Sequence, residues 1–72
     1  MKNKERLIEF GLRIKRERLF RRLSQEELAE KVDLSRNMIS LIETGKSTPT
    51  ILKVIAIADA LEVDIDKLLK DL

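Results

Sequence analysis

Residues 25–44 carry the pattern that most restricts the fold of this chain, namely two short apolar periodicities separated by a tight turn. The apolar side chains recur at the spacing of one helix face: Leu28, Ala29 and Val32 before the turn, and Ile39 and Ile42 after it. Ala29 is small, so a second helix can cross the first one closely at this point. The pattern predicts two short helices joined at Asp33 and Leu34.

Both of these helices have a cap residue at the expected start. Ser24 precedes the first helix and Glu27 follows three residues later, which is the sequence of a capping box. Ser35 precedes the second helix, which we expect to begin at Arg36. Two capped starts eleven residues apart indicate a helix-turn-helix, a motif whose second helix typically enters the major groove of DNA.

Helical spacing also predicts the elements around this motif. A first helix is expected over about residues 4–20, with Gly11 as a tolerated weak point. The two helices of the motif are expected over about residues 25–32 and 36–44. Gly45 is expected to end the later one, because a residue without Cβ adopts the left-handed conformation at least cost.

Two further helices follow in this interpretation. One is expected to start near Ile51, with Thr50 or Thr48 as its cap. Its expected inward face is the row Ile51, Val54, Ile55, Ala58 and Leu61. Asp64 is expected to cap a short fifth helix. We therefore expect residues 1–72 to form a single all-α domain, a compact five-helix bundle.

Length and composition limit the chemistry of the chain. A chain of 72 residues buries only about 60% of its unfolded surface, so its core must be small. The absence of Cys and His, of a Gly-rich phosphate loop and of carboxylates at metal-ligand spacing leads us to expect no enzyme, no cofactor and no metal. No apolar run approaches the roughly 20 residues of a membrane span, and the start lacks the apolar segment of a signal peptide, so the expected location is the cytoplasm.

Charge is distributed unevenly although the net charge is only +2. Residues 13–22 contain six basic side chains and one acidic side chain, whereas residues 59–72 contain five acidic and two basic ones. Together with the helix-turn-helix, the basic segment favours contact with phosphate. The alternative is that both segments are merely the solvated faces of helices.

The order of these landmarks is similar to that of a known family. They are Ser24 to Ala29, then Ser35, Ile39, Glu43, Gly45, Lys46 and Pro49, and finally Ala60, Leu61 and Val63. From about Phe10 to Leu69 the chain resembles the Xre family of lambda-repressor-like helix-turn-helix domains. The resemblance implies that the third helix reads double-stranded DNA in the major groove.

Carried over by position, the resemblance implies a set of base-reading residues on that helix: Ser35, Arg36, Asn37, Ser40 and Leu41. Arg36 has the fork that suits guanine, Asn37 has the amide that suits adenine, and Leu41 suits a thymine methyl group. The alternative for Arg36 is a phosphate contact, and the alternative for Leu41 is partial burial or a dimer contact. Met38 is interpreted as a packing residue.

The resemblance also implies residues that position the domain on DNA. Gln25, at the start of the second helix, corresponds to the phosphate-clamping Gln of the family. Lys46, in the loop after the reading helix, is expected to be a second phosphate contact. Arg18 and Glu43 correspond to a structural ion pair between the first and third helices, the alternative being two unrelated surface charges. Breaking such a pair when it is half-buried costs about 3–5 kcal/mol.

Three residues depart from the pattern of the family. Arg22, Asp33 and Glu62 occupy positions where the family usually has a Gly at a helix end or turn. Asp tolerates left-handed geometry, whereas Arg and Glu cost roughly 1 kcal/mol each if they adopt it. Either these turns differ locally from those of the family, or the folded state loses stability. Asp33 also adds a negative charge near the reading helix.

The sequence leads to one preferred function and one alternative. We expect a transcriptional regulator, in the simplest case a repressor, that binds a pseudo-palindromic operator as a homodimer. An activating contact with RNA polymerase is also allowed. The expected dimer interface consists of apolar residues near the end of the chain: Ile65, Leu68, Leu69 and Leu72. The alternative is an antitoxin-like module that binds a partner protein, for which an exposed Phe20 is a candidate contact.

Overall fold

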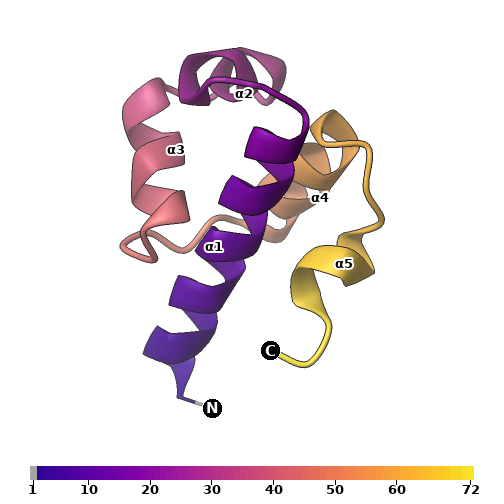
Figure 1. The fold of residues 1–72 in the computed structure, drawn as a ribbon. Helices are drawn as coiled ribbons and strands as arrows, with labels where there is room; N and C mark the ends of the chain where they lie inside the picture. The colour runs from indigo at the N-terminus through magenta and orange to yellow at the C-terminus, as the bar shows by residue number, and fades with distance from the viewer. Residues whose placement is uncertain (1) are drawn as a thin grey trace.

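Five α-helices form the computed structural model, which describes residues 2–72 and contains no strand in that range (Figure 1). They are α1 (Asn3–Phe20), α2 (Gln25–Lys31), α3 (Arg36–Glu43), α4 (Ile51–Ala60) and α5 (Ile65–Leu69). The all-α prediction and the number of helices are confirmed. The predicted bounds are correct to within one residue where both ends were predicted.

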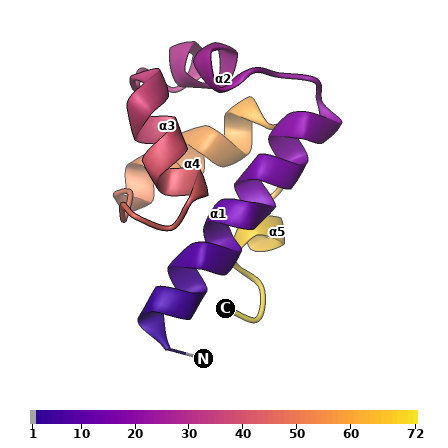
Figure 2. The ribbon, with the colours of Figure 1, turned by 60° about the vertical axis from the view of Figure 1, so that its left-hand side comes forward.

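The long helix α1 connects the two halves of the bundle. It packs against α3 on one side and against α5 on another, as the two views in Figures 1 and 2 show. Helix α2 packs against both α3 and α4, and α4 packs against α5. The pair α2 and α3 therefore rests on a scaffold made by α1 and α4.

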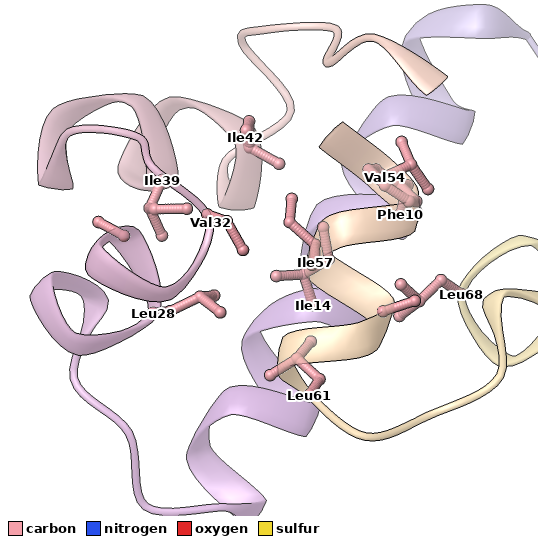
Figure 3. Packing of buried hydrophobic residues seen from close by; sticks show 12 residues of the cluster. Phe10, Ile14, Leu28, Val32, Ile39, Ile42, Val54, Ile57, Leu61 and Leu68 are labelled. Carbon is pink, nitrogen blue, oxygen red and sulfur yellow. The ribbon is translucent and has the colours of Figure 1, made fainter. Parts of the chain in front are cut away.

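Every helix contributes to one apolar core (Figure 3). Its fully buried large side chains are Ile14, Leu28, Ile39, Ile42, Ile57, Leu61 and Leu68. The predicted inward face of α4 is wrong in part, because Ile51 and Ile55 are exposed and Ile57 is buried in their place. This helix is apolar around most of its circumference, so its periodicity does not distinguish the inward face from the outward one.

Gly11 lies where α1 approaches α3 most closely. A Cβ at this position would be 2.4 Å from the carbonyl oxygen of Ile42 and 2.6 Å from that of Glu43. Gly11 is therefore required for the packing of α1 against α3, which differs from its interpretation as a merely tolerated residue. Gly45 ends α3 with φ +74°, as predicted.

The predicted caps are present at three helix starts. Ser24 and Glu27 form the reciprocal capping box of α2, and the hydroxyls of Ser35 and Thr50 accept backbone N–H groups of α3 and α4. The backbone N–H of Ser24 donates to the Glu27 carboxylate at 2.8 Å. This bond, together with the Ser24 side chain, lowers the pKa of Glu27 below its usual value of 4.5. Asp64 is the N-cap residue of α5, as predicted, but its side chain makes no capping hydrogen bond.

Left-handed backbone occurs at the three positions where the family usually has Gly. Arg22, Asp33 and Glu62 have φ values of 57°, 56° and 58°. Each follows a helix and allows backbone N–H groups to close the helix end, as in the bond from the Leu23 N–H to the Arg18 carbonyl. These turns therefore adopt the left-handed geometry that Gly takes at least cost, and each carries the cost of a side chain.

Candidate nucleic-acid interface

Helices α2 and α3 form a compact helix-turn-helix. Ala29 is buried, and its carbonyl accepts the N–H of Leu34 at 3.0 Å across the turn. Asp33 reverses the chain in the left-handed conformation, and Ser35 then caps α3 through the N–H of Met38 at 3.1 Å. The start of α3 is therefore held by local bonds, which gives its side chains a defined direction.

The first residues of α3 project into solvent. Ser35, Arg36 and Asn37 are exposed, and within residues 2–72 the side chains of Arg36 and Asn37 make no hydrogen bond or salt bridge. Ser40 and Leu41 are half-buried. Asn37 and Leu41 are four residues apart, so they share the face opposite the buried Ile39.

Met38 departs from its interpretation as a packing residue. Its side chain belongs to the exposed surface, with 37% of its area accessible. The inward positions of α3 are instead filled by Ile39, Ile42 and Glu43. Met38 therefore adds an apolar side chain to the surface at the start of α3.

A buried polar network joins α3 to α1 and α2. The Arg18 guanidinium donates from Nε to Oε2 of Glu43 at 2.6 Å and from Nη2 to Oε1 at 3.0 Å. Both residues are buried, with 6% and 4% of their surface exposed. Arg18 Nη1 also donates to the Leu23 carbonyl at 2.8 Å. The ion pair implied by the resemblance is thus present and lies inside the bundle, so the alternative of two unrelated surface charges is wrong.

Gln25 is the third side chain of this network. Its amide nitrogen donates to Oε1 of Glu43 at 3.1 Å, and the side chain is half-buried at the first residue of α2. An amide nitrogen carries two hydrogens, so one N–H remains available for another acceptor. The network fixes the orientation of this amide next to α3.

Most of the basic residues in the run of residues 13–22 have partners inside the protein. Arg13 donates to Glu9 at 3.0 Å and to the carbonyl of Lys70 at 2.7 Å, which ties α1 to the end of α5. Arg21 contacts Glu62 at 3.4 Å. Together with Arg18 these residues stabilise the fold, so the basic run as a whole is not a phosphate-binding surface.

The loop after α3 adds one exposed cation. Lys46 is exposed, and its backbone N–H donates to the Leu41 carbonyl at 2.9 Å, which closes the end of α3. The side chain of Lys46 makes no salt bridge within the described residues 2–72. Its charge is therefore available to an anion beside the helix-turn-helix.

The dimer interface expected at the end of the chain needs a correction. Leu68 is completely buried in the core of the protomer, so it is unable to contact another chain. Ile65 and Leu72 pack partly against the same core, and Leu69 is 37% exposed. The core of this small domain reaches further into α5 than the sequence indicated.

A larger apolar surface, missed in the sequence, lies on the outward side of α4. Ile51, Leu52 and Ile55 are 61%, 74% and 43% exposed, and their spacing places them on one side of the helix. We call these three residues the α4 row. The composition of residues 51–60 indicates such a surface, because this segment contains more apolar residues than one buried face requires.

Two properties of the described residues bear on other kinds of site. Residues 2–72 contain no group of three or more acidic, Cys or His side chains that is arranged to hold a metal ion. None of the helices in that part of the chain combines the length and apolar character that crossing a membrane requires.

A capped helix-turn-helix whose second helix presents free polar side chains defines a DNA-binding domain. Residues 14–68 match the model of the helix-turn-helix family HTH_3. The chain therefore belongs to this family of Xre or lambda-repressor-like domains, and its DNA-binding character follows from the family. No curated protein sequence matches the chain.

Solved structures of regulators share this fold. The restriction-modification controller protein C.AhdI from Aeromonas hydrophila superposes with a TM-score of 0.89 at 28% identity, over 94% of this chain and 99% of that protein. An HTH_3 family transcriptional regulator from Vibrio cholerae gives a TM-score of 0.85 at 28% identity, over 93% of this chain and 38% of the other. The hypothetical transcription factor NHTF from Neisseria gives 0.85 at 25% identity, over 96% and 79%. The chain is thus similar to DNA-binding transcriptional regulators.

Proposed function

We propose that this protein is a sequence-specific transcriptional regulator that binds a pseudo-palindromic DNA site as a homodimer, with α3 in the major groove. The observation that carries the proposal is the pair Arg36 and Asn37, which are exposed, unpaired within residues 2–72 and placed at the capped start of α3. Arg36 suits the O6 and N7 atoms of guanine, and Asn37 suits adenine. Ser35, Ser40 and Leu41 complete the proposed reading surface.

Contacts with the DNA backbone hold this surface in register. Gln25 and Lys46 are the proposed phosphate contacts, because both flank α3 and both have polar groups free to meet an anion. Such contacts set the position of the domain on the duplex and carry no sequence information directly. The simplest proposed outcome is repression, in which the protein occupies the operator. The proposed location is the cytoplasm, together with the DNA. An activating contact with RNA polymerase is the other allowed outcome.

A selection from a random pool of DNA duplexes at near-physiological salt tests base reading. We expect the wild type to enrich a two-fold symmetric site. The Arg36→Ala variant is expected to lose about 1–3 kcal/mol of preference at one base pair in each half-site. The matched control is Arg16→Ala, since the Arg16 side chain is 65% exposed on α1. No enrichment by the wild type, or the same loss in the control, contradicts the proposal.

The α4 row is the proposed surface for the second copy, with Leu69 as the remaining contribution from α5. A site with two half-sites requires two domains about one helical turn, roughly 34 Å, apart. The longest dimension of the protomer is 31 Å, so two copies in side-by-side contact have a suitable size. An exposed row of three large apolar side chains is also costly to leave in water.

Sedimentation analysis of one surface variant tests this interface. Leu52 is 74% exposed, so Leu52→Ser is expected to leave the fold intact and to weaken the dimer about tenfold or more. The control is Leu19→Ser, which removes an exposed Leu from α1. A wild type that remains monomeric at micromolar concentration, or a dimer lost in the control only, contradicts this assignment.

A protein-binding role is supported by a separate observation at the end of α1. Phe20 is 80% exposed and Leu19 beside it is 55% exposed. An antitoxin-like module that binds a partner protein is therefore the second candidate function. Co-expression with the product of a neighbouring gene tests it, since a complex that Phe20→Ser abolishes supports this function, and an unchanged monomer or homodimer counts against it.

A further inference from the structure

Lys53, in the first turn of α4, is bonded to the end of α2. Its ammonium group donates to the carbonyl of Val32 at 2.7 Å and, over a longer distance of 3.4 Å, to the carbonyl of Asp33. Lys53 is half-buried, and Val32 is the residue at which α2 ends. A side chain from outside the helix-turn-helix therefore contacts the turn inside it.

The two carbonyls have no other donor in the turn. The last carbonyls of a helix lack an intrahelical partner, and a buried carbonyl without a donor destabilises the conformation that buries it. No N–H of a turn, loop or helix cap in residues 2–72 donates to the carbonyl of Val32 or Asp33. An ammonium group carries three N–H donors and suits the negative end of the α2 dipole. Lys53 thus supplies the bonds that the backbone of the turn lacks.

The conformation of this turn sets the direction of the reading helix. Asp33 has a φ of 56°, a geometry that costs stability in a residue other than Gly. The backbone bonds that cross the turn are few, and the bond from the Asp33 N–H to the Glu30 carbonyl is long at 3.4 Å. Helix α3 begins at Arg36, only three residues after Asp33. Without the ammonium group, we expect the turn to populate other conformations.

We infer that Lys53 is a positioning residue for DNA reading, which holds the turn between α2 and α3 in the conformation that directs Arg36 and Asn37 toward the bases. The inference rests on the proposed function and deepens it. Lys53 acts through the turn and not through a contact with DNA. The apparent affinity of a protein falls in proportion to the fraction of molecules in the binding-competent conformation, so a loosened turn weakens binding while the bundle remains folded.

Replacing Lys53 by Met removes the N–H donors and keeps an unbranched apolar side chain. We expect the affinity for the selected site to fall about tenfold, which corresponds to a competent fraction of about one tenth. The slope of log K against log salt concentration is expected to stay at the wild-type value, whereas the loss of a phosphate contact would lower it by about 0.9. Lys53→Arg restores N–H donors at this position and is expected to regain most of the lost affinity.

The matched control is Val54→Ala at the next residue of α4. Val54 is 7% exposed and belongs to the core, so its truncation destabilises the bundle without removing a bond to the turn. Both variants are measured at a temperature where circular dichroism shows that they are folded. Val54→Ala is expected to bind the selected site with wild-type affinity.

Amide hydrogen exchange locates the effect in the chain. The Leu34 N–H bonds across the turn at 3.0 Å, and the Leu61 N–H bonds at 2.9 Å at the far end of α4. In Lys53→Met we expect exchange at Leu34 to accelerate relative to exchange at Leu61, because the turn opens locally.

Four results overturn the inference and leave the proposed function standing. They are wild-type affinity in Lys53→Met, a lower salt slope in that variant, an equal loss of affinity in Val54→Ala, and a loss in Lys53→Arg as large as the loss in Lys53→Met. Uniform exchange at Leu34 and Leu61 also overturns it. A wild type that enriches no DNA site overturns both the inference and the proposed function.

Discussion

Replacing Arg18 by Ala tests whether the buried ion pair holds α3 against α1. The variant leaves the Glu43 carboxylate, which is 4% exposed, without its guanidinium partner. Removing one member of a buried pair costs about 3–5 kcal/mol, because the other charge remains in a medium of low dielectric constant. The Leu23 carbonyl also loses the donor that lies 2.8 Å away, which moves the expected loss toward the upper end of this range.

Thermal and urea unfolding followed by circular dichroism measure this loss. For a domain of 60–100 residues, 1 kcal/mol corresponds to about 4–8 °C in Tm, so we expect Tm to fall by more than about 10 °C. The control is Arg16→Ala, which removes a contact of 4.0 Å at a guanidinium that is 65% exposed. Such surface pairs contribute about 0–1 kcal/mol. Equal, small losses in both variants would refute the structural role of the pair.

A double variant separates the unpaired charge from the lost packing. Combining Arg18→Met with Glu43→Leu removes both charges and is expected to regain much of the stability lost in Arg18→Ala. It is not expected to regain DNA affinity, because Gln25 loses the acceptor at 3.1 Å that orients its amide. A double variant as unstable as Arg18→Ala would mean that packing, and not charge, explains the loss. A double variant with wild-type affinity would show that the network does not position Gln25.

Three further substitutions have defined outcomes in the same unfolding assays. Gly11→Ala is expected to destabilise by about 1–3 kcal/mol in spite of the better helix propensity of Ala, because its Cβ would be 2.4 Å from the Ile42 carbonyl oxygen; a higher Tm would contradict this reasoning. Asp33→Gly is expected to stabilise by less than about 1 kcal/mol, because it relieves a φ of 56° at a residue type that tolerates this geometry, and an unchanged urea midpoint would count against it. Glu27 has a lowered pKa, so its carboxylate stabilises the fold above pH 4.5, the usual pKa value, and this contribution is lost as the pH falls through the pKa of the folded state. The Tm difference between wild type and Glu27→Gln should therefore be present at neutral pH and disappear well below pH 4.5, and a difference that does not change with pH would exclude this cause.

The parts of the fold that the sequence predicted correctly depend on local interactions. The hydroxyls of Ser24, Ser35 and Thr50 meet backbone N–H groups three residues later, so the residues that make each cap are adjacent in the sequence. The same holds for Gly45, whose positive φ is a property of one residue. Asp64 is likewise the N-cap residue of α5 at the predicted position, although its carboxylate accepts no backbone N–H of that helix.

The parts that the sequence did not predict depend on contacts between distant residues. Arg13 donates to the carbonyl of Lys70 and Arg21 donates to Glu62, at separations of 57 and 41 residues. The pairing of Arg18 with Glu43 was implied only by the family resemblance and not by the pattern of the chain itself. A basic run therefore does not reveal which of its cations stabilise the fold and which remain for DNA. The role of Gly11 becomes visible only when α3 lies beside α1.

Helix α4 carries apolar side chains on two sides, and this property bears on the proposed function. Val54, Ile57 and Leu61 face the core, while the α4 row faces outward with equally apolar side chains. Helices that are apolar all round are typical of elements covered on both sides, and this bundle covers α4 on one side only. In the proposed homodimer, a second copy seated on the α4 row supplies the missing cover, and the same contact is proposed to bring two α3 helices to one DNA site. Burial of the row is therefore expected to couple dimerisation to operator binding, so that Leu52→Ser weakens binding to a two-fold site more than binding to a single half-site.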